Sequence, residues 1–303
     1  TNSNLPAFPN TPVPGPQTDD PGGLAFVPSL HYSAQLADQW WFGFSVAAPF
    51  GLHSSYDEAK VMRYVATDSS LKTLDIAPSL AWKTTDWLSL GAGLDFLYVK
   101  ANLDAKTHLG NGTITATNGE GYQKNRADDW ALGWHIGALI DINDGTRLGV
   151  QYRSRFKVKA EGDSENLAAA AIGAIPIGTH FTRQVNTEVT LPDTVVMSGY
   201  HEFNDAWAIM ADVAWVNWSL FQKLRLTYFP LSTTSSDTDT FENFKDTWRV
   251  ALGLNYTYSP EWQFRAGLAW DESPVRREFR TARIPDSDRI WLGVGVGYTM
   301  LEC

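Results

Sequence analysis

Residues 85–98 read TDWLSLGAGLDFLY: a short polar turn, a tryptophan, and then a segment in which every second residue is apolar. The positions between these apolar residues carry Ser89, Gly91, Gly93 and Asp95. Alternation over this length predicts a β-strand with one apolar and one polar face. The tryptophan stands where the turn meets the strand, and an amphipathic indole ring favours that place at a membrane–water interface.

The same unit of turn, tryptophan and alternating strand occurs three more times, at residues 37–40, 204–207 and 259–262. A fifth turn, at residues 143–145, leads into a similar strand without the tryptophan. Repeated units of this kind predict an all-β protein, a transmembrane antiparallel β-barrel. Barrels of this class place short turns on the periplasmic side and long loops outside, so the five turns also predict the orientation.

The two faces of the predicted strands differ in charge. The apolar face carries no Asp, Glu, Lys or Arg in seven strands between Leu88 and Met300, whereas the other face carries charges and many glycines. A soluble sandwich also alternates, but its polar face is bulky and solvated. A glycine-rich face, as in Gly293, Gly295 and Gly297, favours side chains that share the confined interior of a barrel.

Composition narrows the class further. The chain has 303 residues, a mean hydropathy of −0.24 and no apolar run near the roughly 20 residues that a spanning helix needs. The formal charge of −10 argues against nucleic acid as a partner. Cys303 is the only cysteine, so the sequence offers no internal disulfide and no cysteine-based metal site.

The strands follow one another through the whole chain, which we interpret as one domain, residues 1–303. A bacterial single-chain barrel closes with an even number of strands. About eleven strands can be placed, and no signal peptide is visible, so we expect a barrel domain truncated at both ends. The predicted strands are 24–36, 40–48, 72–83, 87–103, 128–142, 146–161, 185–202, 207–228, 244–259, 262–272 and 288–301.

Several motifs resemble a known family. The resemblance is to the outer-membrane long-chain fatty acid transporters of the FadL/TodX type, which include transporters of aromatic hydrocarbons. The motifs follow the family's order and span nearly the whole chain. They are PFGL at 49–52, LPD at 191–193, FKDTWR at 244–249, DESPV at 271–275 and RIPDSDR at 283–289.

The resemblance implies a barrel of fourteen strands with an N-terminal hatch domain in the lumen. It implies passive uptake of a hydrophobic small molecule, such as a fatty acid or hydrocarbon, by a monomer in the bacterial outer membrane, without a cofactor. The ligand is caught by outer loops and released sideways into outer-membrane lipid at a kinked strand, which Pro49 and Gly51 mark here. By the same comparison the hatch, the first strand and the last two strands are absent.

A carboxylate that leaves water needs a cation, and the resemblance offers candidates. Lys245 matches a lysine that contacts the ligand head group in the family; pairing with Asp246 or Glu242 is the alternative. A second family cation, an arginine, aligns with Ala105.

Two lysines near Ala105 could substitute for that arginine, Lys106 and Lys100.

The apolar tail needs a slot, and two segments offer one. The first is the loop 167–177, far too apolar for a free external loop, with Ile172, Ile175 and Ile177 as ligand candidates. The second is the kink, with Ala48, Phe50 and Leu52. Packing against the hatch is an equally good interpretation of Phe50 and Leu52.

One predicted strand carries a row of five basic residues that we expect to face the lumen. The row could guide anionic ligands, or it could pair with the hatch or with Asp95, Asp141 and Asp212. Its members are Arg147, Arg153, Arg155, Lys157 and Lys159.

The sequence shows no catalytic constellation. The six histidines have no metal-ligand spacing, and residues 141–145 favour a hairpin turn over a calcium loop. We therefore expect neither an enzyme nor a metal site. A porin for polar solutes is the first alternative function, and a barrel enzyme or adhesin is the second.

Overall fold

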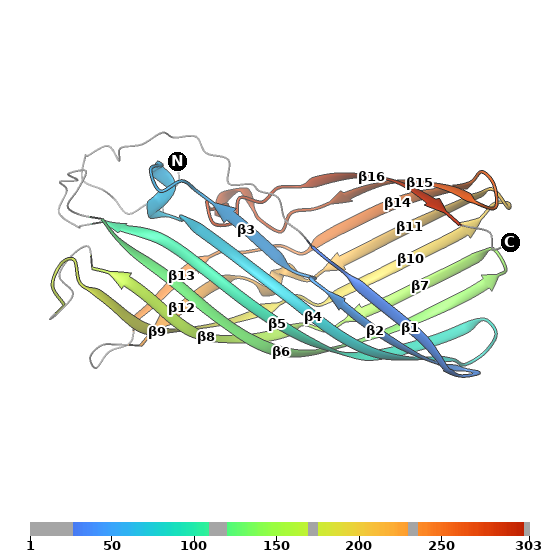
Figure 1. Ribbon diagram of the computed structural model, residues 1–303, viewed down its shortest axis with the longest axis horizontal. Helices are drawn as coiled ribbons and strands as arrows, with labels where there is room; N and C mark the ends of the chain where they lie inside the picture. Colours follow the sequence, from blue (N-terminus) through green and yellow to red (C-terminus); the bar gives the residue numbers. More distant parts are fainter. Residues whose placement is uncertain (1–26, 109–119, 169–174, 230–235, 300–303) are drawn as a thin grey trace.

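The computed structural model describes residues 27–108, 120–168, 175–229 and 236–299 (Figure 1). They form one antiparallel sheet of sixteen strands and three short 3-10 turns, η1 (Val61–Tyr64), η2 (Trp218–Leu220) and η3 (Arg277–Phe279). In this part of the chain no helix has the length and apolar character to cross a membrane. The strands are β1 (Leu30–Ala37), β2 (Trp40–Ala47), β3 (Gly51–Ser55), β4 (Asp68–Lys83), β5 (Leu88–His108), β6 (Glu120–Asn143), β7 (Thr146–Arg153), β8 (Phe156–Leu167), β9 (His180–Leu191), β10 (Thr194–Glu202), β11 (Trp207–Val216), β12 (Lys223–Tyr228), β13 (Ser236–Phe241), β14 (Thr247–Thr257), β15 (Trp262–Asp271) and β16 (Arg289–Tyr298).

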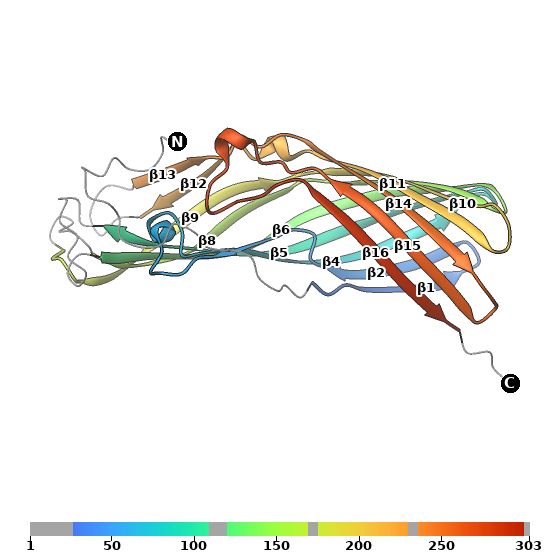
Figure 2. The same ribbon diagram turned by 90° about the horizontal axis from the view of Figure 1, so that it is seen from above.

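The continuous wall of the sheet contains eleven strands, in the order β1-β2-β4-β5-β6-β7-β10-β11-β14-β15-β16. The predicted all-β architecture is thereby confirmed. Figure 2 shows the wall from above, strongly curved, with β15 and β16 reaching the same side of the molecule as β1 and β2. Among the described residues β1 and β16 are the edges of the wall and do not pair with each other.

The five short turns lie together at one end of the wall, on the right in Figure 1. Their side chains close them: Asn204 Oδ1 accepts hydrogen bonds of 3.0 Å from the N–H groups of Ala206 and Trp207. At the other end β5 and β6, with 21 and 24 residues, are twice as long as the roughly 10 residues that a spanning strand needs. The wall therefore extends well beyond the membrane on the side opposite the turns.

Aromatic pairs mark both membrane boundaries on the outward face. Near the turns, Trp40 stacks on Trp82 with ring centres 5.8 Å apart. Higher on the wall, Tyr98 lies 5.2 Å from Trp130, and in the same strand Leu90 and Leu94 are exposed. Apolar side chains between two aromatic girdles are typical of a lipid-facing wall.

Three predicted strands are each broken at the same level of the wall. Strand 146–161 divides into β7 and β8, 185–202 divides at Pro192 into β9 and β10, and 207–228 divides into β11 and β12. The outer pieces β8, β9, β12 and β13 form a branch of the sheet, on the left in Figure 1, which joins the wall where β8 pairs with β6.

A one-residue slip at the first break reverses the faces of the strand. His135 is opposite Arg153, but Asp128 is opposite Glu161, so the β8 side contains one extra residue. Because side chains alternate with a period of two, one extra residue exchanges inward and outward positions. Gly133 accommodates the change, since a Cβ atom there would lie 2.5 Å from the Phe156 ring.

The prediction that Lys157 and Lys159 face the lumen is therefore wrong. Both are exposed, whereas the residues that alternate with them, Phe156, Val158 and Ala160, belong to the buried core. The core cluster consists of Leu97, Val99, Ala127, Ala131, Phe156, Val158, Ala160 and Leu191.

The remaining basic residues of the row pair with acids of the wall itself. Arg147 lies 3.3 Å from Asp141, and Arg155 lies 3.3 Å from Asp193. The third basic residue, Arg153, bridges two buried acids, Asp75 of β4 and Asp95 of β5. The three arginines of the row are therefore paired with acids of the sheet itself. Asp212, one of the acids expected to pair with the row, takes no part in the ion pairs of the described residues.

Candidate ligand-binding site

The wall is interrupted between β2 and β3, at residues 48–50. Ala47 is opposite Asp75 on β4, and Gly51 is opposite Lys72, so the β2–β3 side again contains one extra residue. The bulge reverses the faces, so that Phe50 turns onto the core of the lumen.

Thr73 of β4 fixes this interruption. Its hydroxyl accepts a hydrogen bond of 3.1 Å from the N–H of Phe50 and donates one of 2.5 Å to the carbonyl oxygen of Phe50. Pro49 has no N–H to offer a ladder. On the other side, the β1 ladder ends with Leu30 opposite Val46, so in the described chain β4 alone borders the interruption.

A row of aromatic rings crosses the lumen from this point. Phe50 makes edge contacts with Phe156 at 6.5 Å and with Trp218 of η2 at 5.9 Å between ring centres. Phe244 continues the row, 5.8 Å from Trp218 and 5.0 Å from Phe221. The row joins the interrupted strand to the loop before β14 by apolar surface.

A charged group lies on the lumen face of β4–β7, around the level of the interruption. Asp75 and Asp95 are both buried; Arg153 lies 3.5 Å from the first and 3.6 Å from the second. His135 Nδ1 lies 3.1 Å from the Asp95 carboxylate. A strongly polar group, whose charges are paired with one another, therefore lies on the same face of the sheet as the aromatic row.

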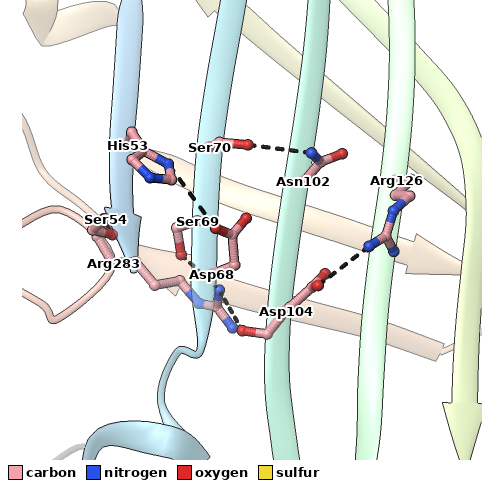
Figure 3. Close-up of polar contacts among 9 residues, drawn as sticks. All are labelled: His53, Ser54, Asp68, Ser69, Ser70, Asn102, Asp104, Arg126 and Arg283. Carbon is pink, nitrogen blue, oxygen red and sulfur yellow. Dashed lines mark hydrogen bonds and ion pairs between the residues drawn. The ribbon is translucent and has the colours of Figure 1, made fainter. Parts of the chain in front are cut away.

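The loop between β15 and β16 reaches across to β3, β4 and β5 (Figure 3). Tyr56 donates a hydrogen bond of 2.8 Å to the carbonyl oxygen of Ala282, and Ser54 donates one of 3.0 Å to that of Arg283. The Arg283 guanidinium in turn donates to Ser69 Oγ at 3.0 Å and to the carbonyl oxygen of Asp104 at 3.5 Å. Segments more than 200 residues apart thus meet beside the lumen.

The predicted cations already have acidic partners. Lys245 pairs with Glu272, and not with Asp246 or Glu242 as the alternative had it. Lys106 lies 2.6 Å from Glu58.

Lys100 is exposed, opposite Lys72, on the outward face of the wall. The structure therefore does not bring the three predicted lysines together.

The predicted apolar residues divide in the same way. Phe50 lies in the aromatic row, with Ala48 and Leu52 partly buried beside it. Ile177 is 62% exposed and Ile175 partly buried. Ile172 lies outside the described residues.

Four polar residues near the mouth were not among the predicted ligand-binding residues. Tyr228 is buried, with the Arg183 guanidinium carbon 3.9 Å from its ring centre. Glu242 is only 1% exposed, and burial raises its pKa to about 7 against the opposing charge of Arg283. The sequence held one signal for two of them: Arg283 begins the motif at 283–289, and Glu242 lies just before the motif at 244–249.

The described residues contain no group of three or more His, Cys, Asp or Glu side chains that could hold a metal ion.

Comparison with known proteins agrees with this arrangement. Residues 8–302 match the family described as outer membrane protein transport protein (OMPP1/FadL/TodX). The long-chain fatty acid transport protein of Escherichia coli O6:H1 is 30% identical over 305 residues, which are 92% of this chain and 67% of that protein. Outer membrane protein P1 of Haemophilus influenzae is 28% identical, over 90% of this chain and 62% of that protein.

Solved structures show the same fold. The Pseudomonas aeruginosa FadL homologue has a TM-score of 0.84 and 25% identity, covering 98% of this chain and 71% of that one. The Ralstonia pickettii toluene transporter TbuX has a TM-score of 0.70 and 20% identity, covering 90% of this chain and 72% of that one.

Proposed function

Because the chain belongs to the family of outer membrane transport proteins (OMPP1/FadL/TodX), integral β-barrels of the bacterial outer membrane, we propose that it mediates passive uptake of hydrophobic compounds. Relatives are named for long-chain fatty acids and for toluene, so either class is a reasonable substrate. The observation that carries the proposal is the aromatic row, which runs from the loop before β14 to the interrupted strand.

The proposed path ends at residues 48–50, where the cargo leaves sideways into the membrane. Here the backbone of Phe50 is held by one side chain, Thr73, and not by a ladder. An apolar cargo moving on past Arg153 and His135 would remove water from polar side chains that are still partly exposed. The lateral route between Pro49 and lipid carries no such cost.

The apolar part of the ligand site consists, in this proposal, of Ala48, Phe50 and Leu52, with Ile175 and Ile177 nearer the outside. Ile172, which lies outside the described residues, stays a prediction from the sequence. Pro49 and Gly51 shape the exit.

Lys245 and Lys106 stand near the mouth, where a carboxylate can reach them by displacing Glu272 or Glu58. Lys100 stays a weaker candidate, because it is exposed on the outward face and lies nearer the turns along β5 than Lys106. We propose no catalytic residue.

Binding and conductance distinguish this function from that of a polar-solute porin. We expect the protein, purified in detergent, to bind a fluorescent fatty acid saturably and to give little ion conductance in planar bilayers. Absence of saturable binding of any apolar ligand, together with steady conductance, would favour the porin.

A further inference from the structure

Two arginines that face the mouth of the lumen have no carboxylate partner in the described part of the chain. Arg283 donates only to Ser69 and to a backbone carbonyl, both uncharged acceptors. Arg183 lies over the Tyr228 ring, and its buried Nε atom has no hydrogen-bond partner. Guanidinium groups removed from water normally have anionic partners, because the cost of desolvation is otherwise uncompensated.

The two arginines lie at the same level of the sheet. Arg283 donates to Ser69 of β4, and the residues opposite Ser69 on the successive strands β5, β6, β8 and β9 are Leu103, Asn125, Ser164 and Arg183. Asp104 and Glu242 are the acids whose charges act on Arg283, yet neither forms an ion pair with it within 4 Å in the described part of the chain, and Glu242 Oε2 is unpartnered. Burial raises the pKa of Glu242 and so disfavours the charged form that would compensate Arg283.

This polar group adjoins the aromatic row. Glu242 and Phe244 belong to one short segment before β14, and Gln222 accepts hydrogen bonds from the N–H groups of Glu242 and Asn243 through its carbonyl oxygen. Phe244 contacts Trp218, which contacts Phe50. A cationic end therefore continues into an apolar path.

We propose that Arg283 and Arg183 form a site for the carboxylate of an amphipathic ligand whose apolar tail lies along the aromatic row. The inference rests on the proposed function and adds to it the residues that recognise the head group. A guanidinium suits this task because its parallel N–H groups match a carboxylate. Lys245 and Lys106, which already have acidic partners, are less available for it.

Arg283 also brings a guanidinium to β5 from a distant part of the sequence. Its guanidinium lies against the carbonyl oxygen of Asp104, next to Ala105. The loop between β15 and β16 thus supplies a cation at a point of β5 that has a small apolar side chain.

The test compares two ligands that differ only in the head group, dodecanoate and dodecanol, by displacement of a neutral fluorescent probe from the purified protein. We expect Arg283→Gln to weaken dodecanoate binding about ten- to a hundredfold, the usual effect of losing a hydrogen bond to a charged group, and to change dodecanol binding less than twofold. Arg183→Gln should show the same selectivity. Arg283→Lys should recover part of the loss.

Arg277→Gln, on an exposed position of the same loop, is the matched control and should change neither ligand. Equal weakening of both ligands by Arg283→Gln, or no effect on dodecanoate, would overturn the head-group site while leaving hydrophobic uptake intact. If the unaltered protein bound neither ligand, the proposed function would fail first, and this site with it. Folding of each variant is checked by heat-dependent mobility in gels.

Discussion

Replacement of Thr73 by valine tests whether one side chain holds the interrupted strand. Thr73 is nearly buried, and its hydroxyl makes both polar contacts of the Phe50 backbone that we describe, at 3.1 and 2.5 Å. Valine has almost the same shape, so packing is kept while both hydrogen bonds are lost. Each bond contributes about 1 kcal/mol net, which gives a loss of about 2 kcal/mol.

That loss corresponds to a change of about 30-fold in the unfolding equilibrium. It can be measured by urea titration of the protein in phospholipid vesicles, followed by tryptophan fluorescence. Thr73→Ser retains the hydroxyl and is the control, for which we expect less than half of the effect. If Thr73→Val unfolded at the same urea concentration as the unaltered protein, the hydroxyl would not hold the interruption and the reasoning would be refuted.

Three further predictions concern the lumen. Phe156→Ala removes a fully buried ring from the core and should cost about 3–5 kcal/mol in the same titration; a cost below 1 kcal/mol would show that the ring is not packed. Folding raises the Glu242 pKa to about 7, so its contribution to stability is present at low pH and is lost as the pH rises through about 7. In Glu242→Gln the free energy of unfolding should therefore vary less between pH 5 and 8 than in the unaltered protein, and an unchanged pH profile would contradict this. Lys245→Ala should weaken carboxylate binding only about two- to fivefold, since its ion pair is partly exposed, and should spare a neutral hydrocarbon; equal losses would refute a head-group role.

The alternation of residues predicted most of the wall. Strands such as 87–103 and 262–272 follow a period of two without interruption, and their outward face is apolar over the part that spans the membrane. The turn at residues 204–207 could also be predicted, because Asn204 closes it locally.

The interruptions could not be placed in the same way. A single extra residue near Ser154 exchanges the two faces, yet the sequence on both sides keeps alternating, so Lys157 was assigned to the lumen. Pro49 marks the interruption of the ladder locally, but the residue that fixes it, Thr73, lies on another strand.

The site was even less accessible from sequence. Arg283 reaches Ser69 from more than 200 residues away, and only the fold brings them together. The family resemblance drew attention to Lys245, but it could not show that Lys245 forms an ion pair with Glu272.

Deletion of Pro49 tests the central claim, sideways release at the interrupted strand, most directly. Without this one residue, β2 and β3 have the same register against β4, and the ladder can run from Ala47 to Gly51. The measurement is uptake of a radiolabelled fatty acid by cells that carry the deletion, beside binding to the purified protein. We predict that uptake is lost while binding remains. Uptake at the unaltered rate through a continuous strand would contradict the lateral exit.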